Sequence, residues 1–106
     1  TVLMVNKKNW RNLVRNNAKL SGDINESIII SHLMKSGWDV FKNMSCTGPV
    51  DMIAYCRDSN KIIKLDAKSA RTEPTSEQKE NEIYTCYIND NEDRLTINKG
   101  NECIEI

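Results

Sequence analysis

The chain has 106 residues, which is enough for one small domain with a single hydrophobic core. Its hydrophobic content of 39% and charged content of 28% are ordinary for a globular protein in water. No apolar run approaches the roughly 20 residues that span a bilayer, and the N-terminal residues lack the apolar stretch of a secretory signal, so we expect a cytoplasmic protein.

The formal net charge of zero hides an uneven distribution of charge along the chain. Residues 1–72 contain 12 Lys and Arg against 6 Asp and Glu, whereas residues 73–106 contain 3 against 9. The basic part predicts a surface for a polyanion, and the acidic part predicts a segment kept away from it or used to contact another subunit. The four cysteines have no C-x-x-C or Cys/His spacing, so we expect reduced thiols and no structural zinc site.

Residues 6–20 are predicted to form an amphipathic helix with one apolar stripe. Basic residues recur along another face of this helix, and the first 22 residues contain no acid. Such a face can bind nucleic acid, because Lys and Arg release counterions from phosphates. A solvated helix face without a ligand is the alternative. The candidate nucleic-acid-binding residues of this helix are Lys8, Arg11, Arg15 and Lys19.

The Ser21-Gly22 pair is expected to end that helix, and a second helix is expected to start with a capping box at Asp23 and Glu26. Glu26 then has two interpretations. It either returns a hydrogen bond to the Asp23 backbone or turns from the first helical turn toward a metal site. The second helix has enough apolar residues to be largely buried, and Gly37 is expected to end it.

Strand patterns follow the second helix. Residues 38–42 are expected to form the first strand, and residues 50–56 and 61–68 form the next two. The four-residue turn between the last two predicts an antiparallel hairpin. The later elements are expected to be a helix at residues 75–83 and strands at residues 84–89, 94–98 and 103–106, with residues 84–106 forming a β-rich C-terminal extension.

Charged side chains gather at one end of the predicted hairpin. Alternation puts Asp66 and Lys68 on the same face of their strand, two residues and roughly 7 Å apart. Asp51 precedes the apolar run of the neighbouring strand, and antiparallel pairing brings it near Asp66, as a shared metal ion would require. A solvated strand face without a chemical role is the alternative interpretation of these three residues.

Glu26, Pro49-x-Asp51 and Asp66-x-Lys68, taken in this order, resemble the motifs of the PD-(D/E)XK nuclease superfamily. The order of elements is also similar to that family: an acid on a helix, an Asp-bearing strand, a tight turn and the D-x-K strand. The small Holliday-junction-resolvase-like and the phage or homing-type endonucleases are closest in size. The chain departs from the family pattern in that Asp66 stands where Glu is commoner and Pro49 precedes Asp51 by two places, but neither departure removes a ligand.

The resemblance implies one nuclease domain over residues 1–106 with an α/β fold, in which a restriction-endonuclease-like core has a central mixed sheet of four to five strands flanked by helices in the order αβββαβ. It also implies a bound Mg²⁺, or Mn²⁺ in its place, because oxygen ligands suit hard cations. Lys68 would orient the attacking water, and Arg71 and Gln78 would contact DNA. The implied metal ligands are Asp51, Asp66 and the Ala67 carbonyl directly, and Glu26 through water or with a second ion.

These features together predict a metal-dependent endonuclease that hydrolyses DNA phosphodiester bonds, with branched or junction DNA among its substrates and no membrane partner. Cutting both strands requires two sites, so we expect a homodimer, with the acidic C-terminal third and its Ile97, Ile104 and Ile106 as the subunit contact. The alternative is a non-catalytic nucleic-acid-binding or assembly module with the same fold. A small toxin-like or tRNA-directed nuclease would share the site but not the substrate.

Overall fold

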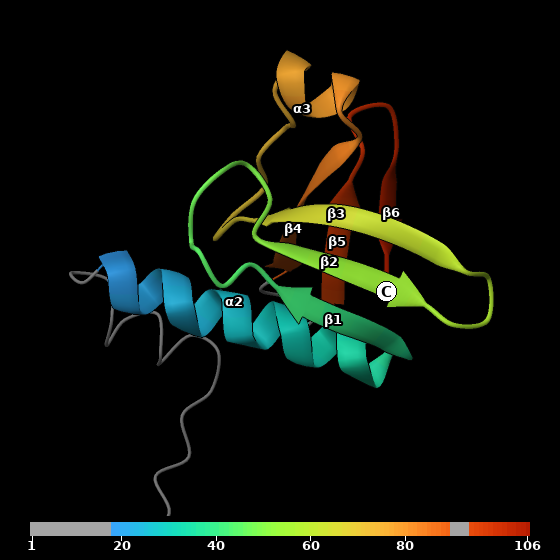
Figure 1. Ribbon diagram of the computed structural model, residues 1–106. Helices are drawn as coiled ribbons and strands as arrows, with labels where there is room; N and C mark the ends of the chain where they lie inside the picture. Colours follow the sequence, from blue (N-terminus) through green and yellow to red (C-terminus); the bar gives the residue numbers. More distant parts are fainter. Residues whose placement is uncertain (1–17, 90–93) are drawn as a thin grey trace, which may run out of the picture.

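A six-stranded mixed sheet forms the centre of the computed structural model, which describes residues 18–89 and 94–106, without the side chains of residues 18–21 (Figure 1). The strands stand in sequence order from β1 to β6. The elements are α2 (Ala18–Lys35), β1 (Trp38–Lys42), β2 (Met52–Cys56), β3 (Lys61–Ala67), α3 (Ser76–Glu80), β4 (Ile83–Asn89), β5 (Arg94–Asn98) and β6 (Cys103–Glu105).

The predicted α/β class and the mixed sheet are confirmed, but the sheet has six strands where four or five were expected. All neighbouring strands pair antiparallel except β3 and β4, which are parallel and are connected through α3. Strands β5 and β6 of the β-rich C-terminal part continue the same sheet. None of the described helices is long and apolar enough to cross a membrane.

Helix α2 does not end at Ser21-Gly22, so the predicted helix end and the capping box at Asp23 are wrong. The helix is continuous from Ala18 to Lys35, and the Ser27 hydroxyl donates to the Asp23 carbonyl one turn earlier, as in a helix interior. A helical glycine costs only about 1 kcal/mol relative to alanine. Burial of the apolar face of α2 against the sheet outweighs this local cost.

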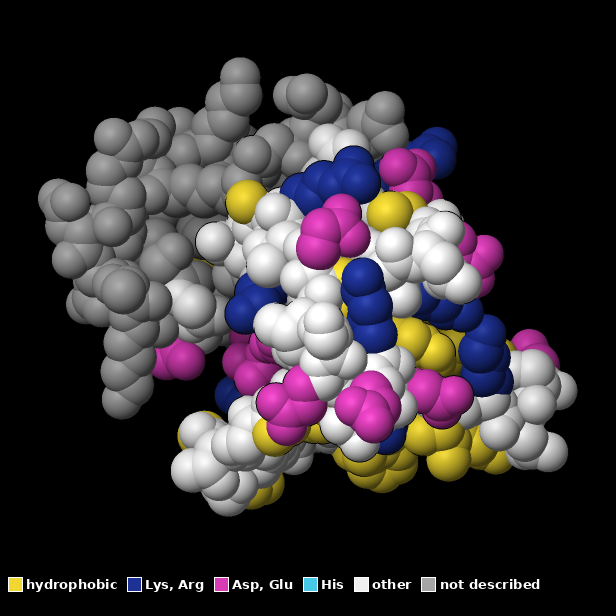
Figure 2. Space-filling view, turned by 90° about the horizontal axis from the view of Figure 1, so that it is seen from above, with side chains coloured by type: hydrophobic (Ala, Val, Ile, Leu, Met, Phe, Trp, Pro, Cys, Tyr) yellow, Lys and Arg dark blue, Asp and Glu magenta, His cyan; other side chains and the backbone are white. Residues whose placement is uncertain are grey.

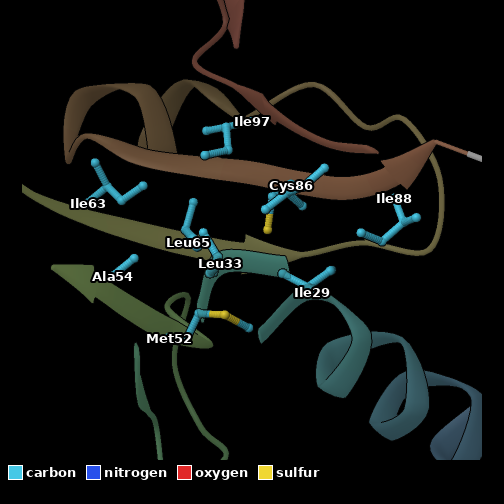
Figure 3. Close-up of a cluster of buried hydrophobic side chains, with 10 residues drawn as sticks. Ile29, Leu33, Met52, Ala54, Ile63, Leu65, Cys86, Ile88 and Ile97 are labelled. Atoms are coloured by element: carbon cyan, nitrogen blue, oxygen red, sulfur yellow. The ribbon is translucent and has the colours of Figure 1, made fainter. Parts of the chain in front are cut away.

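The core lies between α2 and one face of the sheet (Figure 3). Ile29 and Leu33 of α2 are fully buried, and each contributes about 1.5–3 kcal/mol through the hydrophobic effect. Ile97 of β5 belongs to this core with only 3% exposure, so its predicted role in a subunit contact is wrong. The sheet contributes the other members of the cluster, Met52, Ala54, Ile63, Leu65, Cys86, Ile88 and Leu95.

The other face of the sheet is covered only in part. The Thr85 hydroxyl of β4 donates to the Thr72 carbonyl, and Thr85 is fully buried, so the loop before α3 covers this strand on the face away from α2. Thr75 caps α3, and the helix ends at Glu80, three residues earlier than predicted. None of the described elements covers the same face of β1, β2 and β3, where Phe41 and Ile62 are exposed.

Candidate functional site

Asp51 and Asp66 lie opposite each other at one end of the β2–β3 hairpin. The register pairs Met52 with Leu65, which places Asp51, directly before β2, across from Asp66. The Asp51 backbone N–H donates to the Leu65 carbonyl at 2.9 Å, and Asp51 Oδ2 accepts a hydrogen bond from the Ala67 N–H at 2.8 Å. The expected proximity of the two acids is thus present in the structure.

One amide and one ammonium group hold the Asp66 carboxylate on its own side of the sheet. Its Oδ2 atom accepts a hydrogen bond from Gln78 Nε2 at 2.7 Å and lies 3.3 Å from Lys68 Nζ. Because the Asp66 side chain is only 15% exposed, these contacts compensate for much of its lost hydration. The ion pair places Asp66 and Lys68 on the same face, as strand alternation predicts.

Gln78 connects α3 to this site. Its Oε1 atom accepts a hydrogen bond from the Thr75 N–H at 2.9 Å, which closes the capping box of α3, while its Nε2 atom donates to Asp66. We expected Gln78 to contact DNA, and in the structure its amide contacts the acid. A single side chain therefore ties the start of α3 to the D-x-K strand.

Glu26 faces the site from α2. Its Oε1 atom lies 3.5 Å from Lys42 Nζ at the end of β1, and its side chain is largely buried. Because α2 is continuous here, the alternative in which Glu26 caps a helix start at Asp23 does not apply. Glu26 and Asp51 both line a hollow of about 220 Å³, together with Asp23, Lys42, Asn43 and Cys46.

The pKa of Asp51 is raised above its ordinary value, first by burial and then by the neighbouring carboxylates. Burial raises the pKa of Asp51, the hydrogen bond from Ala67 opposes this effect, and the negative charges of Asp66 and Glu26 raise the pKa further. Burial also raises the pKa of the Cys86 thiol on β4, with smaller contributions from the same three carboxylates. Negative charge therefore concentrates at one place, where a bound cation would relieve the repulsion.

Sequence analysis did not single out two further residues at the site, Asn25 and Lys42. Asn25 is 3% exposed, and its Nδ2 atom donates to the Lys68 carbonyl at 2.8 Å, which fastens α2 to the end of the D-x-K strand. Its buried Oδ1 atom has no hydrogen-bond partner in the part of the chain that the structure describes. An amide among the isoleucines of a buried helix was the sequence signal for Asn25; Lys42 gave none.

The site residues suit a hard divalent cation by their chemistry. Glu26, Asp51 and Asp66 all offer carboxylate oxygens, which Mg²⁺ and Mn²⁺ prefer. No group of three or more His, Cys, Asp or Glu side chains within residues 18–89 and 94–106 has the close arrangement of a finished metal site. The unpartnered Asn25 oxygen and the raised pKa of Asp51 are the structural features that fit a bound cation or a bound hydrogen-bond donor.

The predicted nucleic-acid-binding residues are placed in part. Lys8, Arg11 and Arg15 lie outside the described residues, and Lys19 lies on α2 where side chains are not described. Arg71 is exposed in the loop after β3, where its Nη2 atom lies 3.4 Å from a Glu73 carboxylate oxygen.

No family model matches this chain, and no curated protein or solved structure shows significant similarity to it. The meaning of the site therefore depends on the chain's own residues and on their geometry.

Proposed function

We propose that this protein is a metal-dependent endonuclease of the PD-(D/E)XK kind, which hydrolyses phosphodiester bonds of DNA, including branched or junction DNA. The observation that carries the proposal is the meeting of Asp51 and Asp66 at one hairpin end, with Lys68 paired to Asp66 and Glu26 facing Asp51 across a hollow. The order of α2, β1, β2, β3, α3 and β4 supports a restriction-endonuclease-like core, because it follows the family's αβββαβ arrangement.

In this proposal Asp51, Asp66 and the Ala67 carbonyl would hold Mg²⁺ or Mn²⁺ directly, and Glu26 would hold it through water or bind a second ion. When bound, such a cation supplies a nucleophilic water, neutralises phosphate charge and stabilises the leaving oxygen. The Lys68 ammonium orders the attacking water by hydrogen bonding and offsets the charge that grows on the phosphate.

The remaining contacts position these groups. Gln78 holds the Asp66 carboxylate from α3, and Asn25 holds the Lys68 backbone from α2. Each restraint comes from a different element, so both helices limit how far the acidic strand ends can move. Such rigidity favours catalysis, because small displacements of a reacting group cost large factors in rate.

A second candidate function is a non-catalytic nucleic-acid-binding or assembly module. One observation favours it: protein groups already donate to both Asp51 Oδ2 and Asp66 Oδ2. A purely structural set of polar contacts would have the same appearance. The two candidates differ in whether the acids are needed for cleavage.

The test is cleavage of plasmid, junction and single-stranded DNA in Mg²⁺, in Mn²⁺ and in EDTA. We expect metal-dependent cleavage that Asp66→Asn and Lys68→Ala each reduce by about 100-fold or more. Lys61→Ala is the matched control, because Lys61 is an exposed lysine of the same strand on the opposite face. DNA binding without cleavage by the parent chain would favour the non-catalytic module. Cleavage of RNA and not of DNA would show that the proposed substrate is wrong.

We also propose that the active form is a homodimer in the cytoplasm, because one small domain supplies one site and a duplex has two strands to cut. Analytical ultracentrifugation with and without DNA tests this proposal, and a monomer in both conditions would contradict it.

A further inference from the structure

An apolar and aromatic surface lies on the open face of the sheet directly beside the acids. Phe41 of β1 pairs with Ile53 of β2, and Ile53 pairs with Lys64 of β3, so the three side chains form a row across the strands. Tyr55 and Ile62 form the next row. We call these five residues the open-face platform.

The three apolar side chains of the platform are exposed to solvent. Phe41 is 59% exposed, Ile62 is 63% exposed and Ile53 is 37% exposed. In the view from above, hydrophobic side chains gather along the lower margin, which is the side facing the reader in Figure 1 (Figure 2). Neighbouring exposed apolar side chains on one sheet face mark an interaction surface more often than chance placement.

Strand geometry makes the platform continuous with the acids. Asp66 stands two residues after Lys64 on β3, so it is on the same face as this platform residue, and Asp51 directly precedes β2 opposite Asp66. Two residues of strand span about 7 Å. A strand that placed a phosphate at the acids and ran along β3 would bring its neighbouring nucleotides over Lys64 and then over Tyr55 and Ile62.

Lys64 is the cation that the platform offers to an anionic partner, and Asp39, which lies opposite Tyr55 on the same face, is already paired with Arg57. In the described part of the chain no carboxylate lies within 4.0 Å of Lys64 Nζ, in contrast to Lys68, which pairs with Asp66. Tyr55 is held in place because its hydroxyl donates to Asn60 Oδ1 at 2.7 Å. A fixed aromatic ring, a second exposed ring and a lysine that pairs with no described carboxylate are the groups that bind stacked bases and their phosphates.

We propose that the open-face platform binds an unpaired nucleic-acid strand and guides it to the acids, so that the substrate class is DNA with single-stranded segments next to the scissile bond. This inference rests on the proposed function for its choice of ligand. The bases of an intact duplex are already stacked and present phosphates outward, so a duplex gains little from exposed aromatic and aliphatic groups. An unpaired strand can place its bases on them.

The test measures fluorescence anisotropy of a labelled oligothymidylate and of a labelled duplex of equal length, in EDTA so that cleavage cannot intervene. We expect the single strand to bind more tightly at equal salt. Phe41→Thr with Ile62→Thr should weaken single-strand binding by about tenfold, because base stacking on side chains is lost. Threonine keeps the β-propensity of each position. Lys64→Gln should reduce the salt dependence of binding.

Matched controls separate the platform from general surface effects. Met34→Gln changes an apolar side chain that is 62% exposed on α2, and Lys61→Gln changes a lysine of β3 on the other face. Both should leave binding unchanged, and thermal unfolding should show that every variant folds. Equal affinity for duplex and single strand, or no effect of the Phe41→Thr and Ile62→Thr pair, would overturn the proposal.

Two further outcomes decide between this inference and its neighbours. The first outcome is that the parent chain dimerises and that the Phe41→Thr and Ile62→Thr pair abolishes the dimer but leaves single-strand binding intact. The platform is then a contact between copies, and the proposal falls. If the platform variants lose single-strand binding while the parent cleaves nothing in any metal, the platform stands and the nuclease proposal falls. If the parent cleaves DNA and neither cleavage nor binding depends on Phe41, the nuclease proposal stands and the platform proposal falls.

Discussion

Gln78 Nε2 donates a hydrogen bond to Asp66 Oδ2 at 2.7 Å, which joins the first turn of a short helix to an acid 12 positions earlier in the chain. The same amide completes the capping box of that helix through Thr75. The helix has five residues and buries none of them, so its position depends on these two contacts more than on packing. The acid and the helix therefore hold each other in place.

Replacing Gln78 should affect both the helix and the acid, whereas replacing Thr75 should affect the helix alone. Gln78→Ala and Thr75→Ala should each lower the free energy of unfolding by about 1 kcal/mol in urea titrations, because each removes part of the cap. Only Gln78→Ala should also change Mn²⁺ binding, measured by calorimetry. The same loss of Mn²⁺ binding in Thr75→Ala would show that the Asp66 contact has no separate role.

The raised pKa of Asp51 makes stability depend on pH in a defined direction. A carboxyl whose pKa is raised by folding stabilises the native state while it is protonated, and this contribution is lost as pH rises through the raised value. The free energy of unfolding of the metal-free parent should therefore fall, relative to Asp51→Asn, as pH increases above the ordinary Asp value of 3.8. Chemical denaturation of both proteins at a series of pH values measures this difference.

A divalent cation should reverse the loss. At neutral pH, Mg²⁺ should stabilise the parent more than Asp51→Asn, because the cation binds the ionised carboxylate. Identical pH profiles for the two proteins, or equal stabilisation by Mg²⁺, would contradict the placement of Asp51 in a field of like charges. The comparison between variants cancels other groups such as Asp39, whose pKa is lowered by its hydrogen bond with Arg57.

Asn25 should contribute to stability out of proportion to its size. Asn25→Ala leaves the Lys68 carbonyl without its donor, and we expect a loss of about 1–3 kcal/mol in urea unfolding. Ser31→Ala is the control, because it removes an exposed side-chain hydrogen bond on the same helix and should change stability little. Equal effects of the two substitutions would mean that the buried amide is dispensable.

Asn25→Asp tests the charge of the site with almost no change in shape. A carboxylate at this buried position should destabilise the protein more at pH 7 than at pH 4, because burial and the acids of the site both disfavour its charged form. Thermal unfolding at the two pH values gives the answer. A penalty independent of pH would contradict the burial of position 25 in a site that disfavours a further negative charge.

Lys42 should weaken cation binding while adding little to stability. Its ion pair with Glu26 is partly exposed, so Lys42→Ala should change the free energy of unfolding by less than about 1 kcal/mol. Removing this competing ammonium should tighten Mn²⁺ binding, measured by calorimetry, and Lys61→Ala should not. Weaker Mn²⁺ binding in Lys42→Ala would show that Lys42 assists the site instead of competing for Glu26.

Sequence by itself determined the features that depend on local periodicity. Strand alternation has a fixed period of two, so Lys64, Asp66 and Lys68 had to share a face once this segment formed a strand. A four-residue turn between two apolar runs set the hairpin that brings Asp51 to Asp66. The strands at Trp38–Lys42 and Arg94–Asn98 followed from their patterns and have the expected bounds.

Tertiary structure decided the features that depend on long-range packing. Helix α2 passes through Gly22 because its apolar face is buried on the sheet, a gain that local propensity cannot register. The parallel pairing of β3 with β4 and the union of all six strands in one sheet depend on contacts between distant segments. The contacts from Asn25 to Lys68, from Lys42 to Glu26 and from Gln78 to Asp66 exist only because the fold places separate elements side by side, and no pattern along the chain specifies such distances.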